Sequence, residues 1–314
     1  MLDTDYVDKP LMKTDILESL QTQILLSDGS IGTELQKMGL EPGALGELWN
    51  VDHPERIQSL HRAYLEAGSR LLTTNSFRGN RLALSQYGLE ARIDELNRAA
   101  ATLAREAAAG RAWVMGSLGP FGGFLEPLGD TRAEEVFDVF REQARALLGG
   151  GSDLILIETM SSAEEMDLAI RAAREAGAAV VFATMTFAKV RDGFRTMMGV
   201  SPQQAAEVMD HAGADVIGCN CGTALEMEDH EQIVRALSGF TSKPIIVQPN
   251  AGQPELVGTE IVYRRTPEGM AVKVPALIRA GARVVGGCCG TTPEHIRLFD
   301  EELKKLGDSS TVGR

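Results

Sequence analysis

The stretch that decides the fold is AGADVIGCNC at residues 212–221, because its first half recurs three more times along the chain. The other copies are AGSRLL at 67–72, GGSDLI at 150–155 and AGARVV at 280–285. In each copy a glycine follows a helix-like segment, which fits a helix C′ position where a positive φ costs little. The short apolar run that comes next is typical of a strand buried in a parallel sheet.

Four further apolar runs complete a set of eight predicted strands. They lie at residues 24–26, 112–115, 179–185 and 244–247. Amphipathic stretches separate the strands, and the clearest, residues 92–109, is rich in strong helix formers. Eight alternating strand–helix units in roughly 270 residues predict an α/β fold of the (β/α)8 TIM-barrel type in a single domain. A doubly wound open sheet is the alternative, but no G-x-G-x-x-G follows the first strand.

The predicted barrel occupies residues 21–305, with an N-terminal extension at 1–20 and a polar tail at 306–314 that we expect to fray. The first residues are acidic and lack the apolar segment of a secretory signal. No apolar run reaches the ~18 residues that predict a membrane span. We therefore expect a cytoplasmic protein that does not insert into membranes.

Composition narrows the classes of partner. The 314 residues carry 31 Lys and Arg against 44 Asp and Glu, a formal net charge of −13. Nucleic acids and anionic membranes both attract basic surfaces, so neither is expected as a main partner. Apolar residues make up 44% and charged residues 24%, which indicates a globular chain rather than a disordered or coiled-coil one.

Polar and sulfur side chains recur at one fixed distance from the repeat glycines. Seven residues beyond each glycine stand Asn75, Glu158, Asn220 and Cys288. Barrel enzymes carry their chemistry at the carboxyl ends of the strands. The spacing therefore predicts that these side chains share one rim.

Four cysteines cluster in the last third of the chain. Cys221, Cys288 and Cys289 fall at the predicted rim, whereas Cys219 is expected to be a small buried apolar residue. Three converging thiolates predict a zinc site, and a catalytic zinc keeps one position open. Buried apolar cysteines, a vicinal disulfide and a redox-active thiol are the alternatives, although no basic residue adjoins the cysteines to lower a thiol pKa.

A series of motifs, in order along the chain, resembles the homocysteine S-methyltransferase family. They are DGSIGT at 28–33, TNSF at 74–77, GSLGP at 116–120, ET at 158–159, GCNC at 218–221, QPNAG at 248–252 and GGCCGTTPEH at 286–295. This family includes the homocysteine-binding module of cobalamin-dependent methionine synthase and the betaine– and S-methylmethionine–homocysteine methyltransferases. The resemblance covers about residues 24–299 and implies a zinc-dependent (β/α)8 barrel.

The resemblance also implies roles for single residues. Cys221, Cys288 and Cys289 correspond to the zinc ligands and so to the catalytic centre. The homocysteine amino acid group would be held by Asp28, Glu158 and the backbone N–H groups around Gly29 and Ser30. Asn220 and Asn250 would shape the pocket. For Asp28 the alternative is a purely local role, because Asp-Gly is a strong turn signal.

The resemblance implies methyl transfer to the homocysteine thiol to give methionine, but it leaves the methyl donor open. A betaine or sulfonium donor favours an aromatic cage, and four aromatic residues fall in predicted rim loops, where loop packing is their alternative role: Trp49, Phe77, Phe121 and Phe124. After Glu158, residues 159–162 read TMSS, which is more similar to the methionine synthase module than to the betaine enzymes. A separate corrinoid protein is therefore a second possible donor, and another thiol a possible acceptor.

Three further expectations concern a role in zinc binding without catalysis, a docking role and the oligomeric state. A zinc–thiolate binding protein would need an internal fourth ligand, and His295 is expected to lie inside a helix instead. A partner that docks on a corrinoid protein would carry an exposed apolar patch at its rim. The long C-terminal extension of the tetrameric betaine enzymes has no counterpart here, so we expect a monomer or homodimer.

Overall fold

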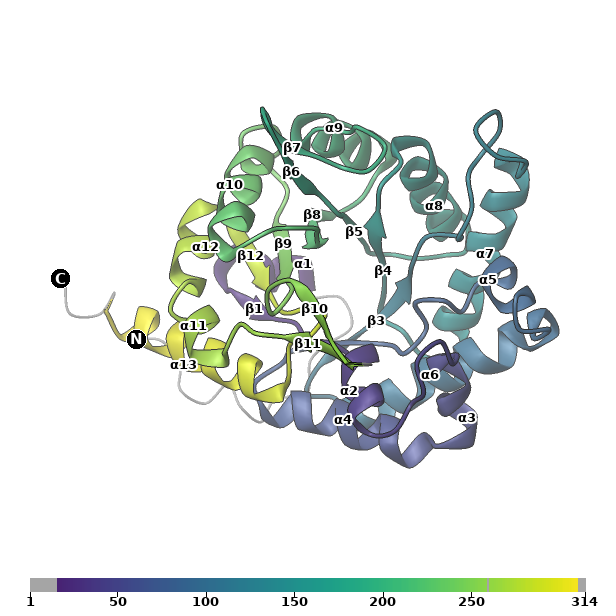
Figure 1. Cartoon of the computed structure of the whole chain (residues 1–314), viewed down its shortest axis with the longest axis horizontal. Coiled ribbons are helices and arrows are strands. Elements are labelled where there is room, and N and C mark those ends of the chain that lie inside the picture. The colour runs from purple at the N-terminus through teal and green to yellow at the C-terminus, as the bar shows by residue number, and fades with distance from the viewer. Residues whose placement is uncertain (1–15, 259, 310–314) are drawn as a thin grey trace.

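The computed structural model describes residues 16–258 and 260–309. Eight parallel strands form one sheet in the order β1-β12-β9-β8-β5-β4-β3-β2 (Figure 1). These are β1 Leu25–Leu26, β2 Leu71–Thr73, β3 Trp113–Leu118, β4 Leu154–Met160, β5 Val181–Met185, β8 Val216–Cys221, β9 Ile245–Pro249 and β12 Ala282–Val285.

The edge strands β1 and β2 join and close the sheet into a barrel. Ser27 forms a parallel bridge with Leu71, and the Arg70 N–H donates to the Leu26 carbonyl over 2.8 Å. Strands that follow one another around the ring confirm the predicted (β/α)8 barrel and exclude the doubly wound open sheet.

Helices form a ring outside the barrel (Figure 1). The principal helices of this ring are α4 Pro54–Glu66, α6 Ile93–Ala108, α7 Ala133–Gly149, α8 Ala163–Glu175, α9 Pro202–Ala212, α10 Met227–Ser238, α12 Val274–Ala280 and α13 Pro293–Ser309. The other helical segments are α1 Ile16–Thr22, α2 Gly32–Lys37, α3 Trp49–Asp52, α5 Arg81–Ser85, α11 Pro267–Ala271 and the 3₁₀ turns η2 Gly46–Leu48 and η3 Glu90–Arg92. The amphipathic stretch at 92–109 is α6, as predicted.

The repeat glycines have the backbone conformation expected of them. Gly213 ends α9 with φ 98°, and the φ angles of Gly68, Gly151 and Gly281 are 111°, 109° and 122°. Only glycine adopts such angles without steric cost, so each one can turn the chain from a helix into the next strand.

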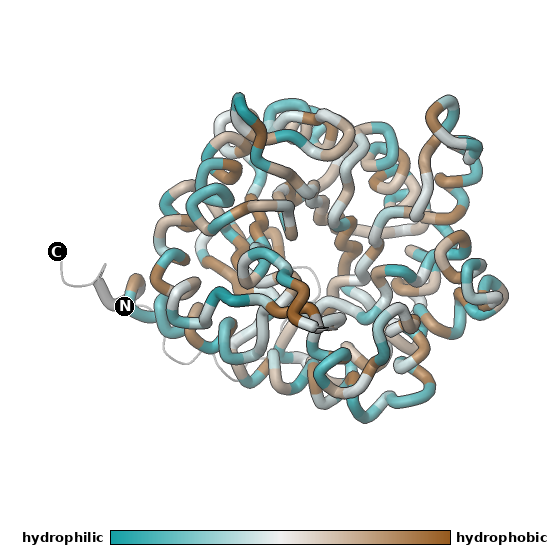
Figure 2. The backbone as a smooth tube through the Cα atoms, in the orientation of Figure 1, coloured by the Kyte–Doolittle hydropathy of each residue, from teal (hydrophilic) through white to brown (hydrophobic). Residues whose placement is uncertain are grey.

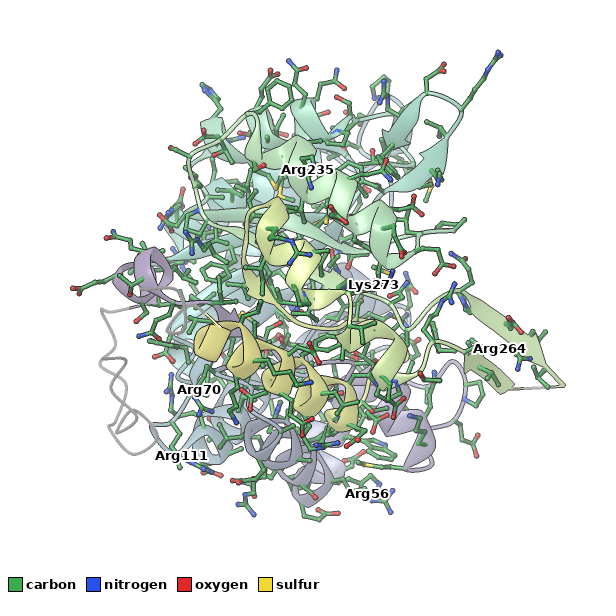
Figure 3. All side chains as sticks on the ribbon, turned by 90° about the vertical axis from the view of Figure 1, so that its left-hand side faces the viewer. Arg56, Arg70, Arg111, Arg235, Arg264 and Lys273 are labelled. Atoms are coloured by element: carbon green, nitrogen blue, oxygen red, sulfur yellow. The ribbon has the colours of Figure 1, made fainter. Side chains whose placement is uncertain are left out.

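Apolar side chains fill the lower part of the barrel. A buried cluster contains one or two residues from each strand: Leu25, Leu71, Trp113, Met115, Leu154, Leu156, Phe182, Val216, Ile246 and Val284. Ile16 and Leu20 of α1 belong to the same cluster and close the amino-terminal end of the barrel, opposite the hairpin formed by β10 Pro254–Val257 and β11 Glu260–Tyr263, which Arg264 directly follows (Figure 3).

The next inward-facing layer is polar. Because strand side chains alternate between faces, the residues two positions beyond the apolar layer also face inward: Ser27, Thr73, Ser117, Glu158, Thr184 and Gln248. Asn220, four positions beyond Val216 in β8, faces inward by the same alternation. Gly286 takes the corresponding position after β12, where a Cβ would lie 1.8 Å from the Ser27 Oγ. This layer forms the floor of the cavity described below.

Helices extend into both the predicted N-terminal extension and the predicted C-terminal tail. Helix α1 belongs to the predicted N-terminal extension, and residues 1–15 lie outside the described residues. Helix α13 continues to Ser309, so residues 306–309 of the predicted tail are helical, and residues 310–314 lie outside the described part. Among helices in the described ranges, none combines the length and apolar character needed to cross a membrane.

Two antiparallel hairpins were not expected from the sequence. One pairs β6 Ala188–Val190 with β7 Gly193–Arg195, and the other pairs β10 Pro254–Val257 with β11 Glu260–Tyr263. The second hairpin lies over the mouth of the barrel (Figure 1). It exposes three apolar side chains, Leu256, Val257 and Ile261, along the hydrophobic segments visible in Figure 2.

Candidate metal and substrate site

A cavity of about 510 Å³ opens at the carboxyl ends of the strands. Three cysteines line it, Cys221, Cys288 and Cys289, together with Glu158 and Thr159 from the end of β4. The segment from Gly29 to Glu47, which includes α2, forms one wall, and Ile261 and Tyr263 of β11 form another.

The three predicted ligand cysteines converge. Their Sγ atoms all lie within 4.8 Å of one another, and the Sγ atoms of Cys288 and Cys289 are 3.9 Å apart. Cys221 is the last residue of β8, and the pair follows β12 two strands away around the barrel. Cys219 is buried and its Sγ lies 3.8 Å from the Nδ1 of His230, outside this cluster, as predicted.

Backbone contacts fix the loop that carries the cysteine pair. The Cys288 N–H donates to the Pro249 carbonyl over 2.8 Å, and the Cys289 carbonyl accepts from the Ala251 N–H over 2.9 Å. A Cβ at Gly287 would lie 2.2 Å from the Thr291 Oγ1, and Gly290 has φ 80°. The glycines on both sides of the pair therefore permit the close approach and the left-handed turn that present both sulfurs to the cavity.

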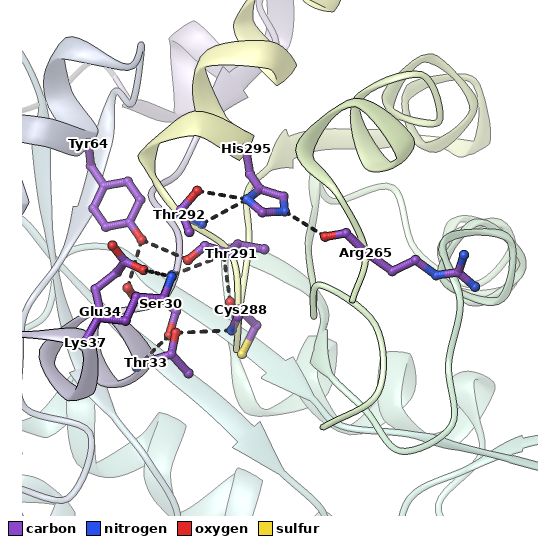
Figure 4. Close-up of polar contacts among 11 residues, drawn as sticks. Ser30, Thr33, Glu34, Lys37, Tyr64, Arg265, Cys288, Thr291, Thr292 and His295 are labelled. Atoms are coloured by element: carbon purple, nitrogen blue, oxygen red, sulfur yellow. Dashed lines mark hydrogen bonds and ion pairs between the residues drawn. The ribbon is translucent and has the colours of Figure 1, made fainter. Parts of the chain in front are cut away.

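Thr291 joins this loop to the segment after β1 (Figure 4). Its Oγ1 donates to the Cys288 carbonyl over 2.6 Å and accepts from the Ser30 N–H over 3.1 Å. The Tyr64 hydroxyl donates to the Ser30 carbonyl over 2.8 Å. The Ser30 N–H, expected to be available to the homocysteine carboxylate, is thus engaged within the protein.

All four cysteines are free thiols. The separation of 3.9 Å between the Sγ atoms of Cys288 and Cys289 is far longer than the ~2.05 Å of a disulfide bond. The vicinal-disulfide alternative therefore does not describe this structure.

The electrostatics of the cluster favour one ionised thiol among three. Hydrogen bonds from the Cys288 and Cys289 thiols lower the pKa of Cys221. Hydrogen bonding with Cys221 raises the pKa values of both partners. A divalent cation would supply the charge that lets all three ionise together.

The donor set and its surroundings fit zinc. Three sulfurs at this spacing can occupy three corners of a tetrahedron of ligands. The Asn250 Nδ2 donates to the Cys221 Sγ over 3.4 Å, and its buried Oδ1 has no hydrogen-bond partner among the described residues. His295 lies in α13 as predicted, with its Nδ1 3.1 Å from the Thr292 N–H and its Nε2 3.2 Å from the Arg265 carbonyl (Figure 4), so its ring is occupied.

The two predicted substrate carboxyl groups occupy different depths. Glu158 lines the cavity, accepts a short hydrogen bond from the Ser117 hydroxyl and lies 3.5 Å from the Asn220 Nδ2. Asp28 is buried and does not line the cavity, and its two oxygens accept from the Thr73 N–H and Oγ1, each over 2.7 Å. Burial raises the pKa of each carboxyl to about 7, and the charge of Asp28 contributes to the rise at Glu158.

The four aromatic residues considered for a cation cage mostly lie elsewhere. Phe77 lines the cavity, whereas Trp49 is buried against Arg56. Phe121 and Phe124 line a separate cavity of about 110 Å³. Tyr263 is an aromatic residue of the main cavity that sequence reasoning missed, and its hairpin could have been recognised from the Gly258 turn signal between the short apolar runs at 256–257 and 261–263.

Residues 25–303 match the family described as homocysteine S-methyltransferase. The chain belongs to this family. Membership confirms the family and the enzyme class expected from the motifs. A solved homocysteine methyltransferase of the family, the metallated form of MmuM from Escherichia coli, is 27% identical, with a TM-score of 0.74 over 90% of this chain and 98% of that one.

Two curated relatives are much longer than this chain. The chain is 34% identical over 318 residues to a methionine synthase of Mycobacterium leprae and 35% identical over 311 residues to that of Mycobacterium tuberculosis. These matches cover 95% and 92% of this chain but only 26% and 25% of the relatives. The chain therefore spans about a quarter of the length of these family members.

Proposed function

We propose that the chain is a zinc-dependent enzyme that transfers a methyl group to the thiol of homocysteine and releases methionine. The observation that carries the proposal is that three thiols lie within 4.8 Å of one another and line the same cavity as Glu158. Cys221, Cys288 and Cys289 would hold the ion, and the cavity leaves space beside them for a fourth sulfur.

Zinc, when bound, supplies the positive charge that lets the homocysteine thiol lose its proton at neutral pH. Three cysteine thiolates would outweigh a charge of +2, so they would leave the homocysteine sulfur nucleophilic once its proton has passed to solvent. The homocysteine thiolate would attack the methyl carbon and form a C–S bond, while the bond from the methyl carbon to the donor would break and its electron pair would leave with the donor. The Glu158 carboxylate would pair with the substrate ammonium and fix the direction of attack.

The donor proposed first is a small molecule of betaine or sulfonium type. A cavity of about 510 Å³ with Phe77 and Tyr263 in its wall favours this assignment. The second candidate is the homocysteine-activating part of a corrinoid-dependent system. The identity to two methionine synthases and the exposed apolar residues of the β10–β11 hairpin favour that alternative.

A donor panel tests the proposal. Purified protein, with its zinc content measured on the same sample, is incubated with homocysteine and glycine betaine, S-methylmethionine or a methylated corrinoid, and methionine is quantified. We expect about one zinc per chain and methionine from one donor class. Cys288→Ala should lose both zinc and turnover, whereas Cys219→Ala, which removes a thiol outside the cluster, should keep both. Full turnover by Cys288→Ala would contradict the proposal.

A further inference from the structure

Thr159 adopts a backbone conformation that its side chain disfavours. Its φ is 65°, in the left-handed region, where a β-branched residue is a steric outlier. The pairing of β4 with β5 shifts register between Ile157 and Met160, so the ladder is interrupted at Glu158 and Thr159. Such an irregularity leaves a backbone N–H without its strand partner.

Asn220 supplies the missing partner from β8, across the intervening strand β5. Its Oδ1 accepts from the Thr159 N–H over 2.8 Å, and its Nδ2 donates to the Thr159 Oγ1 over 2.7 Å. The Thr184 hydroxyl of β5 donates to the same Oδ1 over 2.8 Å. Asn220 is 1% exposed, so this amide clamps Thr159 by two hydrogen bonds inside the barrel.

The clamp determines which residues face the cavity. In a regular strand, neighbouring side chains point to opposite faces, yet both Glu158 and Thr159 line the cavity. The left-handed residue makes this possible because it turns the chain directly after Glu158. Asn220 is not among the residues that line the cavity, and its Oδ1 already accepts two hydrogen bonds. Its Nδ2 lies 3.5 Å from the Glu158 Oε2 and 3.9 Å from the Cys288 Sγ, both longer separations than its 2.7 Å bond to the Thr159 Oγ1.

We infer that Asn220 is a positioning residue that acts through Thr159: it holds the left-handed turn and thereby aims the Glu158 carboxylate at the substrate ammonium. This role replaces the direct pocket contact expected from the family resemblance. The inference rests on the proposed function, because it assigns Glu158 to homocysteine.

Glycine provides the test, since it adopts the left-handed conformation without a clamp. Asn220→Ala should raise the KM for homocysteine roughly tenfold and leave the zinc content unchanged. Tenfold is about the factor by which a threonine without these hydrogen bonds disfavours the left-handed conformation. Thr159→Gly alone should raise KM about twofold, because the Oγ1 contact is lost. The double variant should recover most of the loss seen in Asn220→Ala, which a merely structural role of Asn220 would not produce.

Asn80→Ala is the matched control. Asn80 is a fully buried asparagine that caps α5 by accepting from the Ala83 N–H over 2.9 Å, so its loss should lower stability and leave the homocysteine KM unchanged. If Asn220→Ala does not fold, Thr184→Val loosens the same amide and should give a smaller rise in KM that Thr159→Gly reverses.

The outcomes separate this inference from the proposed function. A wild-type protein that methylates homocysteine, combined with a double variant no better than Asn220→Ala, overturns the inference alone. An unchanged KM in Asn220→Ala does the same. A wild-type protein that does not methylate homocysteine with any donor overturns the proposed function and the inference with it.

Discussion

Replacing Glu158 by glutamine should stabilise the protein at high pH and weaken homocysteine binding. Burial raises the pKa of Glu158 from an ordinary value of 4.5 to about 7. A carboxyl whose pKa is raised on folding costs no stability below pH 4.5, and its cost grows until pH 7, where the folded protein also loses the proton. The 2.5 pH units between these values correspond to about 3 kcal/mol, an upper limit because the side chain is partly exposed in the cavity.

Glutamine keeps the shape and can still accept from the Ser117 hydroxyl, so the comparison isolates the charge. Urea unfolding of Glu158→Gln and wild type at pH 5.0, 6.5 and 8.5 should show a gain for the variant that increases with pH and is greatest at pH 8.5. Glu294→Gln is the control of opposite sign, because hydrogen bonds from Arg297 lower the pKa of that exposed carboxyl. A gain at Glu158 that is equal at all three pH values, or a loss that deepens with pH, would refute the reasoning.

Three further changes test two closely packed positions of the barrel and one buried carboxyl. Gly286→Ala should cost about 1–3 kcal/mol in urea unfolding because its Cβ would meet the Ser27 Oγ at 1.8 Å, and Ser27→Gly should restore part of that loss; no recovery would contradict the close approach. Phe182→Ala empties the apolar layer inside the barrel and should cost about 3–5 kcal/mol, whereas a cost below 1 kcal/mol would place that ring outside the core. Burial raises the pKa of Glu165 to about 7, so Glu165→Gln should gain stability above pH 7 and none near pH 4.5, while its amide oxygen still accepts from the Phe121 N–H.

The barrel and the position of its rim could be predicted because both follow from one local rule. Glycines with a positive φ follow α4, α7, α9 and α12, a buried strand comes next, and the residue seven positions beyond each glycine reaches the rim. This rule placed Glu158, Asn220 and Cys288 at the same end of the barrel. It also placed Asn75 at this rim, where its Nδ2 donates to the Gly46 carbonyl and to the Asn50 Oδ1.

The hairpins were missed because they are short and partly exposed, and so lack the buried apolar runs by which the other strands were recognised. The Asp192-Gly193 pair, at the point where the chain enters β7, is a common turn signal that could have located the first one. The second hairpin matters more for function, because Tyr263 and Ile261 form a wall of the cavity.

The conformation of Thr159 could not be predicted from its neighbours. A threonine disfavours the left-handed region, so local preference argues against the observed turn. The turn depends on Asn220, which is 61 residues further along the chain and comes close only when β4, β5 and β8 are assembled. The depth of Asp28 likewise depends on its two contacts with Thr73, 45 residues away.

The proposed methyl transfer requires an ion held by three sulfurs that accepts a fourth from homocysteine. X-ray absorption at the zinc edge of the loaded protein, recorded before and after homocysteine is added, measures this directly. We expect three sulfur neighbours at about 2.3 Å and one lighter atom in the free protein, changing to four sulfur neighbours with homocysteine. A sulfur count that stays at three when homocysteine is saturating, or a protein that binds no zinc while Cys221, Cys288 and Cys289 are reduced, would contradict it.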